Sequence, residues 1–295
     1  PGSSNPTINA GTIKNEGLEF SINYKNKFSE NFSMSLGYNV TLLKNNVTQI
    51  NGADFLQDGV FGIGQQPPSR MEVGHSIGYF YGLKTDGIFQ NQAEVDAHPS
   101  QLGVGAIASP GDIRYVDVNG DGKIGFDDRT DIGDPIPEAT MGFNVQLNYK
   151  GFDFSLYSFA SIGNNMVRNY ESISDDANRL TYVLDRWTGE GTSNTVPRVT
   201  TAGNANRLFS DYYVEDASYF RIQNAQLGYS IDPNYIQKSG ISKVRLYVGV
   251  NNLYTLTDYK GYDPGASNGK PIGGGIDDGF YPMPRTYLLG LNINF

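Results

Sequence analysis

The sequence predicts an all-β protein whose antiparallel strands cross an outer membrane and are joined by long loops. The last strand shows the pattern most clearly, because its apolar side chains occupy every second position: Tyr287, Leu289, Leu291, Ile293 and Phe295. The positions between them carry Thr, Gly and Asn, with Leu288 as the one apolar exception. Successive side chains of a strand point to opposite faces, so this strand has one apolar and one polar face. A strand of a membrane barrel needs both, since one face meets lipid and the other meets water.

Composition supports this fold class and argues against several functions. The 295 residues include 36 Gly, 20 Tyr and 16 Phe, a mixture typical of β-structure with many turns and aromatic girdles. No Cys is present, and the two histidines, His75 and His98, leave little for a His-based metal or catalytic site. The net charge of −9 argues against nucleic-acid binding and against anchoring on an anionic lipid surface. No run approaches the roughly 18 apolar residues that a membrane helix needs.

Long segments with the strand period of two recur along the chain. A tilted strand needs roughly 9–11 residues to cross a bilayer, and each of these segments is long enough. Lys150-Gly151 predicts a tight hairpin between the third and the fourth segment. The seven predicted strands are 17–28, 32–44, 138–150, 152–164, 218–231, 243–255 and 285–295.

The links between these strands alternate in length. Those after the first, third and fifth strands are short, whereas those after the second, fourth and sixth span about 93, 53 and 29 residues. Bacterial outer-membrane barrels have short periplasmic turns and long extracellular loops, and the chain would then end on the periplasmic side. A soluble sandwich has no reason to place every long link at one end, and links of such length are uncommon in compact domains.

The long links are predicted to contain structure of their own. Residues 74–89 have the pattern of a β-excursion within the first link. Residues Asp175 to Trp187 have helical spacing in the second link, with Gly189 and Gly191 stopping the helix. The third link is rich in Gly, notably at 273–275. Such loops carry whatever a barrel presents to the outside.

The segment Asp117–Asp128 predicts a structural calcium site within the extracellular loop 110–135. Oxygen donors fall at loop positions 1, 3 and 5, Gly122 permits the sharp bend, and a carboxylate stands at position 12. The last donor is Asp rather than the bidentate Glu, which should weaken the site. The alternative is a turn rich in Gly, Asp and Asn that needs no ion. The predicted ligands are Asp117, Asn119, Asp121, the carbonyl of Lys123, and Asp128.

Catalytic patterns are present but have no supporting context, so the chain is not predicted to be an enzyme. Gly74-His-Ser76-Ile-Gly78 matches the nucleophile elbow of hydrolases, yet it continues as a strand rather than a helix. The only later histidine is His98, so coincidence is the better interpretation. Asp side chains on the loops are weak evidence for acid–base work, and Tyr or Trp side chains there are weak evidence for stacking on a ligand. These loop residues are Asp86, Asp96, Asp175, Asp176, Asp277, Asp278, Trp187, Tyr212, Tyr213, Tyr259, Tyr262 and Tyr281.

Motifs along nearly the whole chain resemble the C-terminal barrel portion of the SusC/RagA family of TonB-dependent outer-membrane transporters. The most specific stretch is Pro110–Ile124 with Asp128-Arg-Thr130 and Ile132-Gly-Asp-Pro135 after it. The family's Phe-terminated last strand resembles the signal read by the barrel-assembly machinery, which here falls on Gly290, Ile293 and Phe295. Further matches are Asn9–Glu19, Asp185-Arg-Trp187-Thr, Pro197-Arg198, Phe220-Arg-Ile222, Leu227-Gly-Tyr229, Asn251-Asn-Leu253 and Tyr262-Asp-Pro264.

The resemblance implies a bacterial outer-membrane importer of oligosaccharides or peptides. It implies a barrel of about 22 strands around a plug, energised through TonB-ExbB-ExbD, with a SusD-like lid lipoprotein outside. Residues 1–295 would be one C-terminal part of that barrel, paired with the N-terminal remainder and surrounded by outer-membrane lipid. Pro1 is not an initiator and no signal peptide opens the chain, so a longer protein is expected.

Two other classes stay open on the sequence alone. One is a self-contained barrel of eight strands, which would require residues 74–89 to span the membrane. The other is a secreted, calcium-stabilised β-protein that binds or hydrolyses carbohydrate. A secreted domain should stay soluble without detergent, whereas either barrel should depend on it.

Overall fold

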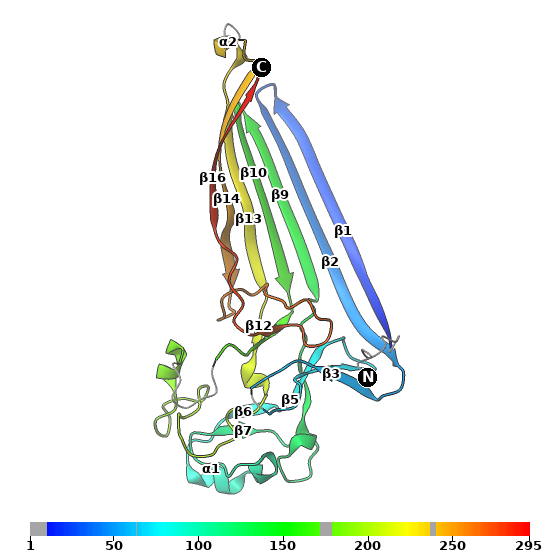
Figure 1. Ribbon diagram of the computed structural model, residues 1–295, viewed down its shortest axis with the longest axis vertical. Helices are drawn as coiled ribbons and strands as arrows, with labels where there is room; N and C mark the ends of the chain where they lie inside the picture. Colours follow the sequence, from blue (N-terminus) through cyan, green and yellow to red (C-terminus); the bar gives the residue numbers. More distant parts are fainter. Residues whose placement is uncertain (1–10, 63, 172–178, 237–239) are drawn as a thin grey trace, which may run out of the picture.

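Seven long antiparallel strands form one sheet in the computed structural model, which describes residues 11–62, 64–171, 179–236 and 240–295. Figure 1 shows these strands side by side, with the long segments that join them collected at one end and the short turns at the other. Each strand neighbours the one that precedes it in this set, and β1 and β16 form the two edges. The strands in order are β1 (Gly11–Ser29), β2 (Phe32–Ile50), β9 (Ala139–Tyr149), β10 (Phe152–Ile162), β13 (Tyr219–Ser230), β14 (Lys243–Thr257) and β16 (Thr286–Asn294).

All seven predicted strands are confirmed, and two of them are longer than predicted. β1 begins at Gly11 and β2 ends at Ile50, so both pass beyond their apolar alternation. The added pairs include Lys14 with Asn46 and Asn15 with Asn45. Polar side chains on both faces give no period-two signal, yet the backbone hydrogen bonds of the ladder continue through them. The sequence pattern therefore marks the apolar zone rather than the end of the strand.

The strand register places apolar side chains in rows across the sheet. One row, from β2 to β16, consists of Met34, Leu147, Phe154, Leu227, Val248 and Leu289. The adjacent row on the opposite face consists of Ser35, Gln146, Ser155, Gln226, Gly249 and Leu288. Each face is thus uniform across six strands, with Leu288 as the only apolar member of the polar row. The sheet has one apolar and one polar surface, as the sequence predicts.

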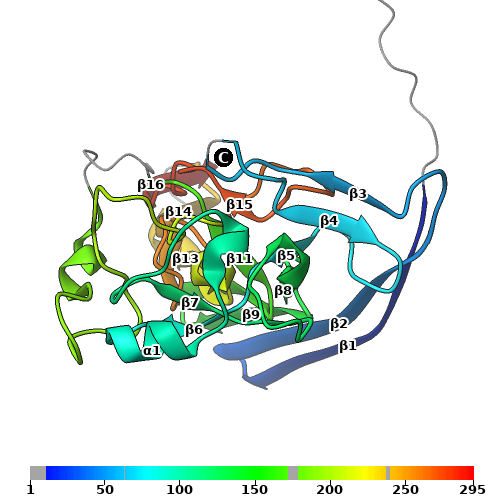
Figure 2. The ribbon, with the colours of Figure 1, turned by 90° about the horizontal axis from the view of Figure 1, so that it is seen from below.

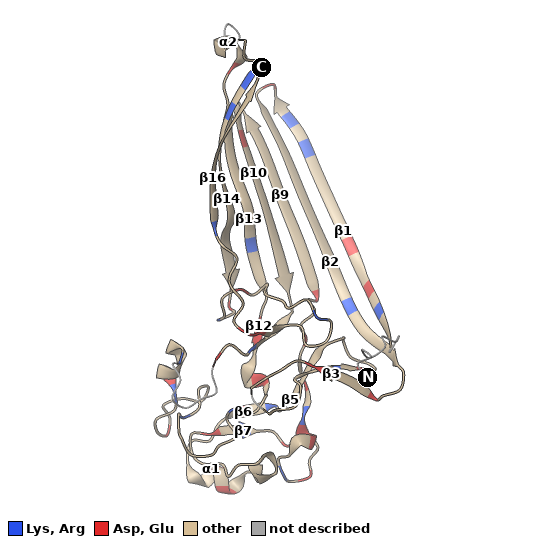
Figure 3. Ribbon diagram, in the orientation of Figure 1, with Lys and Arg blue, Asp and Glu red and all other residues tan. Residues whose placement is uncertain are grey.

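The apolar surface is exposed rather than packed in a core. Leu289 is 82% exposed, Val248 52% and Leu291 54%. Figure 3 shows charged residues at several points along the edge strand β1 but few on the other spanning strands, and β9 and β16 contain none. A contiguous apolar surface of this extent is unfavourable in water and is what a lipid-facing barrel wall requires. The chain therefore forms a segment of an antiparallel transmembrane β-barrel.

Aromatic rings mark the end of the sheet at which the turns are short. Phe32, Tyr149, Phe152 and Tyr229 follow one another in register on four adjacent strands. The centroids of Phe152 and Tyr229 lie 4.7 Å apart, and those of Phe32 and Tyr149 lie 6.2 Å apart. Aromatic side chains with one polar end are favoured at the boundary between hydrocarbon and head groups. This row therefore fits a membrane interface on the short-turn side.

The polar surface is held by side-chain pairs between strands. The Arg245 guanidinium donates to both carboxylate oxygens of Asp153, at 2.8 and 2.5 Å, and to Gln226 Oε1 at 2.9 Å. Asn224 Nδ2 donates to Asn251 Oδ1 at 2.7 Å. Bidentate pairs of this kind fix geometry as well as adding stability. They brace β10, β13 and β14 on the side that would face an aqueous lumen.

Short turns connect the strands at one end of the sheet. The predicted hairpin is confirmed: Lys150 and Gly151 both have positive φ, and Tyr149 pairs directly with Phe152. Two-residue turns of this handedness match the right-handed twist of the strands they connect. The third short link contains α2 (Pro233–Ile236), which lies beside the C-terminus in Figure 1.

The three long links fold into a separate body at the other end of the sheet. Viewed along the strands, this body lies across the end of the sheet (Figure 2). Its small sheets are β3-β4-β5-β8, β6-β7 and β12-β11-β15. Their strands are β3 (Phe55–Asp58), β4 (Ser69–Glu72), β5 (Tyr79–Gly82), β6 (Thr85–Ile88), β7 (Ile113–Tyr115), β8 (Thr130–Gly133), β11 (Asn165–Arg168), β12 (Val214–Asp216) and β15 (Ile276–Asp277). Helical turns are α1 (Gln92–Ala97) and 3-10 segments at Gln101–Val104, Phe126–Asp128, Thr181–Asp185 and Asp211–Tyr213.

The links share hydrophobic cores. Phe80 from the first link, Phe209 from the second and Ile276 from the third lie in one buried cluster. β11 of the second link pairs in parallel with β15 of the third, joining Val167 to Ile276. Buried apolar contacts of this kind contribute about 25 cal/mol for each Å² removed from water. The three links therefore form one body rather than three independent loops.

Two predictions about the links come out differently. The β-excursion at 74–89 is confirmed as β5 and β6, but neither strand joins the seven-stranded sheet. A self-contained eight-stranded barrel built on this segment is therefore wrong. The helix predicted over 175–187 is also wrong for its described part, which contains only the 3-10 segment Thr181–Asp185. Residues 175–178, including Asp175 and Asp176, lie outside the described residues. Among the described residues, no helix is long and apolar enough to cross a membrane.

The two faces of β9 should differ in their tolerance of an introduced charge. Val145 pairs with Leu36 and Leu156 on the apolar surface, whereas Gln146 pairs with Ser35 and Ser155 on the polar one. In the complete protein, Val145→Arg should lower the free energy of unfolding by about 2–4 kcal/mol, because the guanidinium enters hydrocarbon near mid-strand. Gln146→Arg should change it by no more than about 0.5 kcal/mol. Urea unfolding in lipid vesicles measures both, and equal losses would contradict a lipid-facing surface.

Candidate functional site

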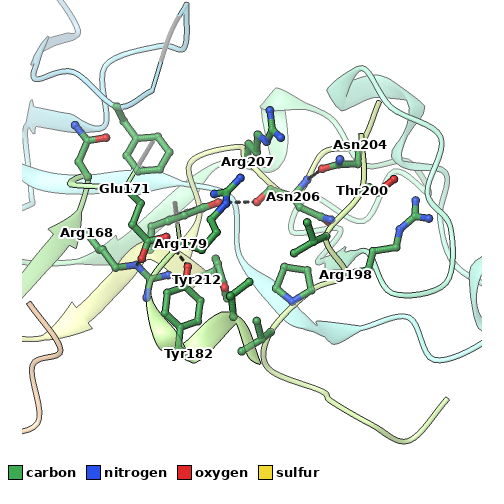
Figure 4. A pocket seen from close by; sticks show the side chains of 17 residues that line it. Arg168, Glu171, Arg179, Tyr182, Arg198, Thr200, Asn204, Asn206, Arg207 and Tyr212 are labelled. Carbon is green, nitrogen blue, oxygen red and sulfur yellow. Dashed lines mark hydrogen bonds and ion pairs between the residues drawn. The ribbon is translucent and has the colours of Figure 1, made fainter. Parts of the chain in front are cut away.

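A pocket of about 90 Å³ lies in the body formed by the long links. Its walls come from the end of β11, the 3-10 segments Thr181–Asp185 and Asp211–Tyr213, and the extended stretch 196–207. Figure 4 shows Arg168, Glu171, Tyr182 and Tyr212 gathered at one end, with Arg198, Thr200 and Asn204 at the other. The pocket therefore combines guanidinium, carboxylate, amide, hydroxyl and aromatic groups in a small space.

Arg168 is the central side chain of this pocket. It is 5% exposed, its Nη1 donates to Glu215 Oε1 at 3.0 Å, and its guanidinium lies 4.7 Å from the centre of the Tyr182 ring. Burial by itself lowers the pKa of the Arg168 guanidinium, but the neighbouring Tyr182, Tyr212, Glu171 and Glu215 outweigh burial and raise the pKa above its ordinary value. Arg168 is therefore a fixed cation held between aromatic faces and carboxylates.

A buried carboxylate holds the other end of the pocket in place. Asp112 is 2% exposed and accepts from Arg198 Nε at 2.8 Å and Nη2 at 3.0 Å. It also accepts from Asn206 Nδ2 at 2.9 Å and from the backbone N–H of Ser109. Asp112 belongs to the first link, whereas Arg198 and Asn206 belong to the second. This network fixes the stretch 196–207 against the first link and so fixes the shape of the pocket.

The predicted calcium loop is folded around its own backbone amides. Asp117 Oδ1 accepts from Gly120 N and its Oδ2 from Gly122 N, at 2.7 and 2.8 Å. Asn119 and Asp121 each accept from the N–H two residues further on, at 2.9 Å. These bonds place the side-chain oxygens on the inside of a tight bend, and Gly122 supplies the positive φ that the bend needs.

Asp128 differs from the other predicted ligands because it is fully buried. Its Oδ1 accepts from the N–H of Val118 and Asn119, and its Oδ2 from the N–H of Gly125, at 2.8, 3.2 and 2.7 Å. With two lone pairs on each oxygen, only Oδ2 keeps one for an ion. Asp128 would therefore be a single-oxygen ligand beside Asp117, Asn119, Asp121 and the Lys123 carbonyl. Within the described ranges, no group of three His, Cys, Asp or Glu side chains has a metal-holding arrangement.

The histidines and the elbow-like motif lie in structural contacts. His75 Nδ1 is 3.1 Å from Asp131 Oδ2, and its ring stacks on Tyr79 with centroids 4.3 Å apart. Ser76 Oγ donates to the carbonyl of Asn45 at 3.3 Å. His98 contacts the Phe89 ring and the carbonyl of Pro99. The turn after Ser76 leads into β5, as predicted, rather than into a helix.

The remaining predicted loop residues are divided between the interior and the surface. Asp277 is 1% exposed and accepts from the Tyr259 hydroxyl at 2.7 Å, and Asp278 accepts from Asn169 Nδ2 at 2.6 Å. Tyr212 and Tyr213 line the pocket, whereas Tyr262 and Tyr281 are 66% and 90% exposed. Asp86 pairs with Arg114, and Asp96 accepts from Gln92 within α1. Among the aromatics named from the sequence, Tyr212 and Tyr213 are therefore the ones placed to contact a ligand in this pocket.

The residues of the predicted assembly signal lie on β16. Ile293 is 41% exposed and Phe295, just beyond the strand, is 91% exposed. Gly290 is opposite Tyr247, whose ring covers it so closely that an added Cβ would clash. Its small size therefore has a packing reason in addition to any role in assembly.

Sequence reasoning missed most of the pocket. Arg168 and Glu171 are three residues apart, but Arg198 lies 30 positions beyond Arg168 and Asn206 further still, and the four follow no known spacing. Pro197-Arg198 is predicted from the sequence only as part of a family resemblance, which gives it no role. The one usable signal was the concentration of Arg and Tyr in the second link, which does not indicate which of these side chains meet.

No family model matches the chain. Named relatives match it along its whole length, however. TonB-dependent receptor P3 of Formosa agariphila is 34% identical over 100% of this chain, and TonB-dependent receptor SusC of Bacteroides thetaiotaomicron is 30% identical over 98%. The chain spans 30% and 27% of the lengths of these two receptors.

Solved structures show the same fold. The structure of the RagAB peptide transporter superposes with a TM-score of 0.72 at 21% sequence identity, covering 97% of this chain and 29% of the matched one. The RagAB peptide importer in its "closed-closed" state gives the same TM-score. The chain belongs to the SusC/RagA-like TonB-dependent receptors.

Proposed function

We propose that this chain is the C-terminal part of the wall of an outer-membrane nutrient importer that is energised through TonB. The observation that carries the proposal is the seven-stranded sheet with one lipid-type surface, one polar surface and every long link at one end. The relatives are named as receptors rather than enzymes, which supports a transport role. In this role the chain catalyses no reaction.

The open edges of the sheet define what else the importer must contain. Within the described residues, β1 and β16 each pair with a strand on one side only. Backbone groups exposed to hydrocarbon are too costly to leave unpaired, so other strands must continue the ladder on both edges. A barrel of about 22 strands around a plug would supply them. The N-terminal remainder of the transporter is the proposed source, and its plug would contact TonB-ExbB-ExbD.

The body of long links is the proposed extracellular part of the importer. Its shared cores hold the pocket in a fixed shape at the end of the sheet, and a SusD-like lipoprotein would cover it from outside. The proposed cargo is an oligosaccharide or a peptide. Gly290, Ile293 and Phe295 would be read by the barrel-assembly machinery when the last strand is inserted.

Uptake by cells tests the transport proposal. The complete protein should be found in the outer membrane as a heat-modifiable barrel and should support uptake of labelled oligosaccharides or peptides. Uptake should stop when TonB is deleted, while the amount of folded barrel stays unchanged, because TonB supplies energy rather than assembly. A protein recovered in the soluble, secreted fraction would contradict the proposal, as would uptake that persists without TonB.

We also propose that the loop 117–128 binds calcium weakly and stiffens the segment 110–135. Side-chain oxygens of Asp117, Asn119 and Asp121 lie inside one bend. Asp128, the Lys123 carbonyl and a water would complete the six oxygens that calcium needs at least. Because Asp128 has only one oxygen lone pair to spare, the affinity should resemble that of extracellular modules, with a dissociation constant of about 0.1–1 mM.

Hydrogen exchange tests the ion site. Calcium should slow exchange of the amides in 117–128, and Asp121→Asn should raise the calcium concentration required several-fold because it removes one negative ligand. Asp128→Asn should loosen the loop with or without calcium, at a cost of about 1–3 kcal/mol, since the amide nitrogen that replaces one carboxylate oxygen cannot accept from the backbone N–H groups bonded to that oxygen. The exposed Asp96→Asn is the matched control and should change neither quantity. Calcium at about 20 mM is 20 times the upper expected dissociation constant. If the exchange rates do not change at that concentration, the loop is a turn that binds no ion.

A further inference from the structure

A second pocket, with a volume of about 230 Å³, lies beside Arg129 in the body formed by the long links. Arg129 comes between the 3-10 segment Phe126–Asp128 and β8. Among the described residues that line this Arg129 pocket, Arg129 is the only charged one. The apolar walls are formed by Leu83, Phe126, Leu208 and Phe209. The pocket therefore presents one guanidinium to an otherwise uncharged space.

Arg129 is the one buried arginine without a carboxylate partner in the part of the chain that the structure describes. The other two are Arg168, which pairs with Glu215 at 3.0 Å, and Arg221, which pairs with Asp263 at 2.6 Å. All three arginines are only 5–7% exposed. A buried charge is normally paired, because the interior solvates it far less well than water does. The exception at Arg129 therefore indicates an anion that the chain itself does not supply.

The contacts of Arg129 are with neutral groups, and a second cation lies nearby. Its Nη1 donates to Gln66 Oε1, and its Nη2 donates to the carbonyls of Pro67 and Tyr81. Burial, together with nearby Arg70, lowers the pKa of the Arg129 guanidinium to about 10, so the group stays a cation at neutral pH. Among the described residues its Nε–H has no partner, and Nε is not sealed in the interior. A donor is therefore free to bind a ligand.

The walls of the pocket are tied together before any ligand arrives. Gln65 Nε2 donates to the carbonyl of Arg207 at 2.8 Å, and Gln65 Oε1 accepts from the N–H of Phe209 at 2.9 Å. These two bonds join the first link to the second at the pocket wall. Phe126 is 49% exposed and marks the side that is open to solvent. A ligand can therefore enter a preformed space, which lowers the entropic cost of binding.

The ligand that fits this pocket carries a single negative charge on an apolar body. One guanidinium offsets one charge, and a carboxylate oxygen accepts from its free N–H. A phosphate or sulfate dianion would lose its hydration against apolar walls that offer no second cation. An apolar cavity of about 150 Å³ holds benzene, so 230 Å³ has room for a ring with a carboxylate attached.

We propose that the Arg129 pocket binds a small monocarboxylate with an apolar body, of the size of benzoate. Arg129 binds the carboxylate, and Leu83, Leu208 and Phe209 contact the apolar body. The site is separate from the pocket at Arg168. It goes beyond the importer function proposed above and does not depend on the cargo.

Saturation-transfer NMR of the complete, detergent-solubilised protein tests the proposal, with benzoate as the probe and protein-free micelles as the background. Benzoate should bind saturably with a dissociation constant on the order of 1 mM, as expected for a ligand of about nine non-hydrogen atoms. Benzamide has the same shape without the charge and should bind at least tenfold more weakly. Arg129→Gln should weaken benzoate binding to the same degree. Arg114→Gln is the matched control: it removes a guanidinium of the same link outside the pocket and should leave binding unchanged.

Folding of the variants is checked by hydrogen exchange in β5 and β8, the strands that adjoin Arg129. If Arg129→Gln loosens these strands, Leu208→Trp decides instead. Its larger side chain fills the pocket while the guanidinium stays in place, so benzoate binding should be lost.

Three results would overturn the proposal. Benzoate does not bind the unsubstituted protein, or it binds the folded pocket variants equally well, and Arg129 is then a structural cation. In the third result benzoate and benzamide bind equally, so that the charge plays no part. None of these results bears on TonB-dependent uptake, which the deletion of TonB tests separately.

Discussion

The structure depends on lateral pairing of strands in a register that keeps the two surfaces of the sheet distinct. In hydrocarbon no water is present to bond a free N–H or C=O, so each must bond to a neighbouring strand. A slip of one residue would turn Leu147 or Phe154 toward the polar side and expose Gln146 to lipid. The turn at Lys150-Gly151 fixes the same register locally. Turn geometry and side-chain pattern therefore specify one pairing, which is the consistency expected of a sequence that folds uniquely.

The two ends of the sheet obey different rules. At the short-turn end the membrane interface favours aromatic side chains, as in the row of Phe32, Tyr149, Phe152 and Tyr229. At the other end the links behave like a small water-soluble domain, with buried apolar clusters and buried ion pairs such as Asp112 with Arg198. That pair is held by four hydrogen bonds to Asp112, so its geometry offsets the cost of desolvation. The pocket belongs to this second environment.

The sequence predicts the sheet well and the pocket poorly, for one physical reason. Strand periodicity is local, so all seven strands and the hairpin at Lys150 can be read from neighbouring residues. The ends of β1 and β2 could not be, because Asn15 and Asn45 pair through the backbone and leave no pattern. The spacing of Leu180, Val183, Leu184 and Trp187 indicated a helix, yet the described part forms a 3-10 turn whose Val183 lines the pocket. Arg168 and Arg198 line one pocket although 30 positions separate them, because β11 packs into a buried cluster through Val167 and Asp112 fixes the stretch 196–207 against the first link.

The common cluster of Phe80, Phe209 and Ile276 also limits how such receptors can diverge. A substitution inside it is felt by three segments at once, so a change of side-chain volume in one requires a matching change in the other two. Side chains at the solvent edge of the pocket, such as Val199 and Thr200, can change without a matching change elsewhere. Homologues are therefore expected to conserve the residues of this cluster and to vary at the edge of the pocket, so that the fold can stay the same while binding preferences change.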